Sequence, residues 1–76
     1  MYDVKVYGRD GCPKCFYVST KMKQTKGVNL TEIHDDNEVR SAAEKYKTAE
    51  LPIVVIDGEY YAFDKAKEWI DARKQG

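Results

Sequence analysis

Two periodicities of apolar and polar residues divide this chain of 76 residues into alternating strands and helices. Tyr2, Val4 and Val6 alternate with charged residues, which predicts a strand with one buried face. Residues 13–26 have apolar positions at helical spacing and begin with a proline, which suits the first turn of a helix. The face shared by these positions holds Cys15, Val18, Met22 and Thr25. Residues 28–33 predict a second strand.

The rest of the chain predicts a helix, a hairpin and a last helix. Apolar residues at i, i+3, i+4 and i+7 form one face of the first of these helices: Val39, Ala42, Ala43 and Tyr46. Residues 52–56 are apolar on both faces, which is typical of a central strand. The Asp-Gly pair that follows favours a hairpin turn, and residues 60–63 predict the returning strand. Asp64 opens the last helix, whose apolar face carries Ala66, Trp69 and Ile70.

These elements follow the order β-α-β-α-β-β-α. The first β-α-β unit requires a right-handed crossover and a parallel strand pair, whereas the hairpin requires an antiparallel pair. We therefore predict an α/β fold with a mixed four-stranded sheet and three helices packed on both faces. Residues 1–76 form one domain, because a chain of this size leaves no room for a second.

The composition excludes several classes of function. Hydrophobic residues make up 42% of the chain, which is ordinary for a globular protein. No apolar run approaches the roughly 20 residues of a membrane span, so we expect no membrane partner. Basic residues do not interleave densely with aromatic residues, so we expect no nucleic-acid partner. The first residues have no basic-then-apolar leader, and we expect a cytoplasmic monomer.

The net charge of zero is divided unevenly along the chain. Residues 1–26 hold six cations and two anions, and residues 27–76 hold seven cations and eleven anions. The basic part contains both cysteines, and nearby positive charge lowers the pKa of a thiol and attracts anionic partners. A mixed, solvated surface explains the same asymmetry equally well.

The two cysteines are the candidate catalytic residues. They form a Cys-Pro-Lys-Cys motif where the first predicted strand ends and the first predicted helix begins. Unpaired backbone N–H groups and the positive end of the helix dipole favour a thiolate at Cys12, and Arg9 and Lys14 add nearby cations. Cys15 lies one helical turn deeper. We predict that Cys12 attacks a substrate disulfide and that Cys15 then resolves the mixed disulfide.

A Cys-x-x-Cys pair is also half of a zinc site. Structural zinc usually takes four protein ligands, but the sequence has no third cysteine and only one histidine, His34. We therefore expect no metal site, and we interpret His34 as a strand-end residue without a role.

Two segments resemble dithiol glutaredoxins. Residues 7–15, Tyr-Gly-Arg-Asp-Gly-Cys-Pro-Lys-Cys, resemble the active-site segment of that family. Residues 51–58, Leu-Pro-Ile-Val-Val-Ile-Asp-Gly, resemble its Thr-Val-Pro strand and the hairpin that follows. The resemblance covers essentially the whole chain. It implies a thioredoxin fold, with Cys12 as the nucleophile, Cys15 as the resolving thiol and Pro52 as a cis-proline.

The resemblance also implies how a disulfide substrate is held. A cis peptide before Pro52 would place the backbone of Leu51 beside Cys12, where its N–H and C=O can pair with an incoming peptide. Asp64 matches the aspartate that holds the γ-glutamyl end of glutathione, although it fits equally an N-cap worth about 1 kcal/mol. The expected substrate-binding residues are Arg9, Lys14, Leu51 and Asp64. Glutathione is the expected co-substrate, and no bound cofactor is expected.

Two alternatives remain beside the glutaredoxin interpretation. Glutaredoxin-like redoxins are similar in length and architecture, take electrons from thioredoxin reductase and reduce ribonucleotide reductase. Phe63 alone matches their Trp-Ser-Gly-Phe-Arg-Pro hallmark, and the Gly-Arg-x-Gly-Cys-Pro segment favours glutaredoxin. A metal or iron–sulfur binding module is the other alternative. We predict a small dithiol oxidoreductase that reduces disulfide-bearing proteins or glutathione mixed disulfides.

Overall fold

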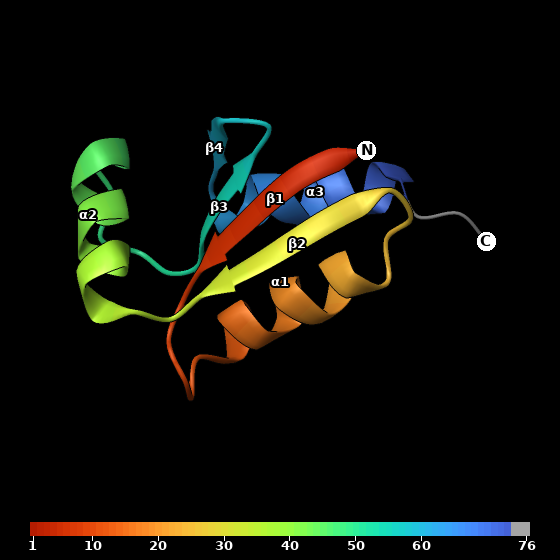
Figure 1. The fold of residues 1–76 in the computed structure, drawn as a ribbon. Coiled ribbons are helices and arrows are strands. Elements are labelled where there is room, and N and C mark those ends of the chain that lie inside the picture. The colour runs from red at the N-terminus through yellow and green to blue at the C-terminus, as the bar shows by residue number, and fades with distance from the viewer. Residues whose placement is uncertain (74–76) are drawn as a thin grey trace.

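A computed structural model describes residues 1–73 and contains seven elements in the predicted order (Figure 1). The elements are β1 (Tyr2–Tyr7), α1 (Pro13–Lys23), β2 (Val28–Ile33), α2 (Asp36–Tyr46), β3 (Ile53–Ile56), β4 (Glu59–Tyr61) and α3 (Phe63–Arg73). None of the helices in this range is long and apolar enough to cross a membrane.

The four strands form one mixed sheet in the order β2-β1-β3-β4. β1 is parallel to β2 and antiparallel to β3, and β3 is antiparallel to β4. This arrangement confirms the predicted crossover and hairpin. Asp57 and Gly58 both have positive φ angles, 50° and 87°, as the tight hairpin between β3 and β4 requires.

The side chains of β3 are buried on both sides of the sheet, which confirms its prediction as a central strand. Val54 and Ile56 face the larger core, which holds Val4, Val6, Val18, Met22, Ala66, Trp69 and Ile70. Ile53 and Val55 face a smaller core with Ala42 of α2. Helices α1 and α3 therefore cover one face of the sheet, and α2 (green in Figure 1) covers the other.

Two helix boundaries differ from the predicted ones. Helix α1 ends at Lys23 rather than at residue 26, because the Thr25 hydroxyl and the Gln24 N–H both donate to the Lys21 carbonyl (2.8 and 3.1 Å) and close the last turn. Helix α3 begins at Phe63, one residue before the predicted start. Asp64 therefore lies within the first turn of α3 and is not its N-cap.

Candidate active site

Cys12 caps the N-terminus of α1. Its backbone is extended (φ −96°, ψ 107°), and its Sγ accepts a hydrogen bond of 3.2 Å from the Cys15 backbone N–H. Pro13 begins the helix without an N–H group, and the first turn contains no acidic residue. The Cys15 N–H and the positive end of the helix dipole therefore both lie next to the sulfur of Cys12. Both favour its thiolate form after reduction.

Cys12 and Cys15 are joined as a disulfide, with their Cα atoms 5.2 Å apart. Cys12 is half-buried, whereas Cys15 is 3% exposed and lies on the buried face of α1. An incoming disulfide can therefore reach Cys12 more easily than Cys15. This asymmetry is the physical basis for giving the two sulfurs different tasks.

Gly8 fits closely against Cys15. A Cβ atom at position 8 would lie 2.8 Å from the Cys15 Sγ and 2.9 Å from its Cβ, closer than such atoms approach in proteins. The Gly8 N–H donates to the Ile33 carbonyl (3.0 Å), which fixes this backbone at the end of β1. The sequence assigned Gly8 no role of its own, because nothing in the local pattern reveals a contact with Cys15.

The Leu51–Pro52 peptide bond is cis, which confirms the predicted geometry. Pro52 is fully buried and directly precedes Ile53, which pairs with Tyr7 at the end of β1. The register of β1 and β3 therefore brings Pro52 beside the start of the loop that leads to Cys12. This register explains why the predicted cis-proline lies next to the redox pair.

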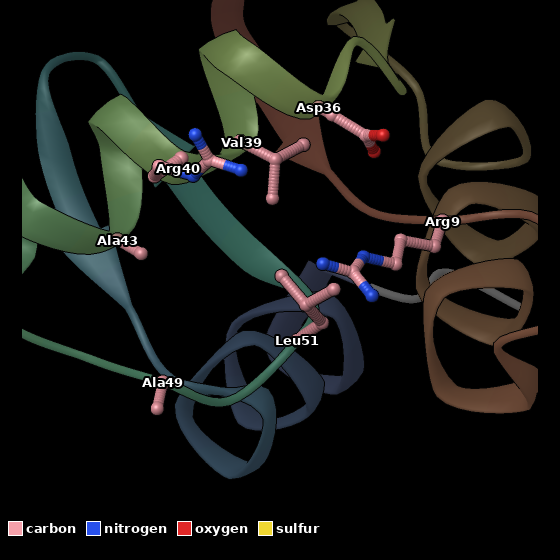
Figure 2. A pocket seen from close by; sticks show the side chains of 7 residues that line it. All are labelled: Arg9, Asp36, Val39, Arg40, Ala43, Ala49 and Leu51. Carbon is pink, nitrogen blue, oxygen red and sulfur yellow. The ribbon is translucent and has the colours of Figure 1, made fainter.

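Arg9 and Leu51 line a pocket of about 340 Å³ between the loop after β1 and helix α2 (Figure 2). The other residues of its wall are Asp36, Val39, Arg40, Ala43 and Ala49. In Figure 2, the guanidinium of Arg9 extends toward Leu51, and Arg40 enters from α2. Among residues 1–73, no carboxylate forms an ion pair with either guanidinium. The pocket therefore offers two cations against the single carboxylate of Asp36, and this net positive charge suits an anionic group.

A smaller pocket of about 170 Å³ is lined by both cysteines. Its wall also includes Phe16, which is 75% exposed, and His34, whose Nδ1 lies 3.2 Å from the Asp10 carboxylate. His34 is an exposed residue just after β2, as predicted, but it lies in the same pocket as the sulfurs. Phe16 provides an apolar surface next to Cys12, which sequence reasoning did not identify.

The remaining predicted site residues lie at the N-terminal ends of α1 and α3. The Lys14 ammonium lies 5.2 Å from the centre of the Phe63 ring, so this lysine extends toward α3. Asp64 is exposed in the first turn of α3 and lines neither pocket described above. Within residues 1–73, no three histidine, cysteine, aspartate or glutamate side chains are grouped as a metal site.

Comparison with solved structures gives the class of this fold. A mutant of the thioredoxin-like protein BC3987 is 28% identical, with a TM-score of 0.74 over 93% of this chain and 96% of the other. The glutaredoxin-like NrdH-redoxin from Escherichia coli is 18% identical, with a TM-score of 0.72 over 97% of both chains. A malarial protein is 17% identical, with a TM-score of 0.56 over 99% of both chains. No family model and no curated protein matches the sequence.

The chain has a thioredoxin fold, and its structural neighbours are thioredoxin-like and glutaredoxin-like proteins. In such a fold, a cysteine pair at the start of the first helix supports a dithiol redox protein. The general chemistry of the pair is the exchange of thiols and disulfides.

Proposed function

We propose that this chain is a glutaredoxin-type oxidoreductase that reduces protein disulfides and glutathione mixed disulfides. The observation that carries the proposal is the position of Cys12, whose sulfur caps α1, accepts the Cys15 N–H and is more accessible than that of Cys15. A reducing compartment such as the cytoplasm suits this chemistry, because it keeps the pair available as a dithiol.

Reduction of a protein disulfide proceeds in two exchange steps. The Cys12 thiolate attacks one substrate sulfur, which forms a mixed disulfide and releases the other substrate sulfur as a thiolate. Cys15 then loses its proton and attacks the Cys12 sulfur, which releases the second substrate thiolate. The substrate gains two electrons and two protons, and Cys12 and Cys15 end as the disulfide that the structure contains.

Glutathione is the reductant that we propose for this disulfide. Its two carboxylates suit the pocket that holds Arg9 and Arg40, and Leu51 at the wall of that pocket precedes the cis-proline. Two molecules of glutathione return the pair to the dithiol, and they leave as glutathione disulfide. Asp64 is the proposed partner of the glutathione amino group, and Lys14 is the proposed contact for substrate carboxylates.

A second candidate is a redoxin that thioredoxin reductase recharges, with a protein disulfide such as that of ribonucleotide reductase as its target. The solved structure of the Escherichia coli redoxin, described as glutaredoxin-like with a thioredoxin-like activity profile, favours this candidate. Glu50 also favours it, because this exposed carboxylate stands next to Leu51 and repels an anionic tripeptide.

The experiment that tests the function measures turnover of a small neutral disulfide with two recharging systems. One contains glutathione and its reductase, and the other contains thioredoxin reductase. We expect faster turnover with glutathione and its reductase than with thioredoxin reductase. Cys12→Ser should lose activity. Cys15→Ser should catalyse only reactions that proceed through a glutathione mixed disulfide. Faster turnover with thioredoxin reductase would favour the redoxin. Full activity of Cys12→Ser would contradict both candidates.

A further inference from the structure

A stripe of lysine and aromatic side chains runs from the Cys-x-x-Cys motif along α1 and α3. We call it the lysine–aromatic stripe, and it consists of Lys14, Tyr17, Lys21, Phe63 and Lys67. The rings of Tyr17 and Phe63 pack edge to face with centroids 6.1 Å apart. Lys67 lies over both rings, at 5.8 and 5.5 Å from their centres, and so connects the two helices.

The spacing of these residues explains why they form a continuous surface. Lys14, Tyr17 and Lys21 follow each other at i, i+3 and i+7 on one flank of α1. Phe63 and Lys67 stand at i and i+4 on α3. The two helices pack against the same face of the sheet, so the two flanks meet. The stripe begins at Lys14, within the Cys-x-x-Cys motif.

The lysines of the stripe have no ion-pair partner in the part of the chain that the structure describes. Helix α1 contains no acidic residue, and its remaining lysine, Lys23, is paired with Glu32 at 3.0 Å. Lys14 lies 5.2 Å from the Phe63 ring and Lys21 lies 5.7 Å from the Tyr17 ring. The rings hold the ammonium groups in one row and leave them open to an external anion.

We propose that the lysine–aromatic stripe docks an acidic protein segment that carries the disulfide to Cys12. This inference rests on the proposed dithiol chemistry and adds the class of protein substrate. Carboxylates that flank the target disulfide would meet the lysine row, and the peptide between them would lie on the two rings. Complementary charge at such a surface raises the rate of encounter and selects among partners.

The test compares three disulfide peptides of equal length whose flanking residues are glutamate, glutamine or lysine. The rate of their reduction by the full chain is measured at about 0.01 M and about 1 M salt, where the screening length falls from about 30 Å to about 3 Å. We expect the glutamate peptide to react about three- to tenfold faster than the glutamine peptide at low salt, and the lysine peptide to react slowest. The preference should disappear at high salt.

Matched variants assign the preference to the stripe. Lys21→Gln with Lys67→Gln removes two charges from it, whereas Lys45→Gln with Lys47→Gln removes two charges from the region of α2, on the opposite face of the sheet. Lys14 is kept, because its substitution would also change the surroundings of Cys12. The ratio of the glutamate to the glutamine rate should approach one in the first variant only.

Two results would overturn the docking surface while the proposed function stands. One is an equal rate for all three peptides, and the other is a preference that both double variants retain or lose alike. A chain that reduces neither these peptides nor a small neutral disulfide would instead refute the proposed function, and the docking inference with it.

Discussion

Replacement of Gly8 by alanine is the substitution that tests most sharply how the fold positions Cys15. The new Cβ would stand 2.8 Å from the Cys15 Sγ and 2.9 Å from its Cβ. Cys15 is 3% exposed and is fixed on α1 between the helix and the sheet, so it has little room to withdraw. Overpacking of this kind costs about 1–3 kcal/mol. For a domain of this size, that cost lowers the Tm by about 4–24 °C.

The cost should depend on the redox state. In the disulfide, the Cys15 Sγ is held by its bond to Cys12, whereas in the dithiol it is free to rotate away from the new methyl group. The oxidised form therefore loses more stability than the reduced form. Because 30 mV corresponds to about 1.4 kcal/mol for this two-electron couple, a difference of about 1 kcal/mol makes the reduction potential about 20 mV more positive.

Thermal denaturation of both redox forms and equilibration of the pair against glutathione buffers provide the assay. Cys15→Gly serves as the matched background, because Gly8→Ala should cost much less once both the Sγ and the Cβ of residue 15 are absent. An equal loss of stability in both backgrounds would refute the argument that Gly8 exists to admit Cys15. So would a loss below about 0.5 kcal/mol in the oxidised chain, which is the size of an ordinary surface substitution.

Three further substitutions test the pocket, the core and a helix cap. Arg40→Gln should raise the KM for glutathione about three- to tenfold and leave kcat nearly unchanged, because it removes a binding contact, and Lys45→Gln on the same helix is the control. Met22→Ala empties a fully buried position of the larger core and should cost about 2–5 kcal/mol in urea unfolding. Asp35→Ala removes the acceptor for the Asn37 and Glu38 N–H groups (2.8 and 3.4 Å) and should cost about 0.5–2 kcal/mol, whereas Asp35→Asn should retain most of the stability.

For each of these three substitutions, a different result would contradict the expected role of the residue. An unchanged KM in Arg40→Gln would show that glutathione does not bind in the pocket that Arg9 and Arg40 line. A cost below about 1 kcal/mol for Met22→Ala would show that the core collapses around the gap. Equal stability of the alanine and asparagine variants at position 35 would show that the side-chain cap contributes nothing to α2.

The strands and helices were predicted correctly wherever a local sequence pattern is compatible with only one kind of element. The run at 53–56 is apolar on both faces, and only a strand between two packed layers satisfies it. The Asp-Gly pair required positive φ at both residues of a tight turn, which the structure has. The start of α3 was not predicted correctly, because Phe63 fits the pattern of a strand equally well. In the structure, the Ala66 N–H donates a hydrogen bond to the Ala62 carbonyl (2.8 Å), which places Phe63 in the helix.

Apart from the cis-proline, which the family resemblance implied, the site was predictable only where it is local in sequence. The cap at Cys12 and the depth of Cys15 follow from the place of the motif at the start of a helix. Gly8 and Arg40 escaped prediction, because their roles come from contacts that the tertiary fold creates. Gly8 lies against a side chain of the next element, and Arg40 lines the same pocket as Arg9, between a loop and α2.

The measurement that most directly tests the unequal roles of the two cysteines is the capture of a mixed disulfide. Reduced Cys15→Ser and reduced Cys12→Ser are each mixed with an excess of one disulfide peptide, and the adducts are followed by mass spectrometry over time. The structure predicts a rapid adduct on Cys12 in Cys15→Ser and a much slower one on the buried Cys15 in Cys12→Ser. Equal rates in the two variants, or a faster adduct on Cys15, would contradict the account.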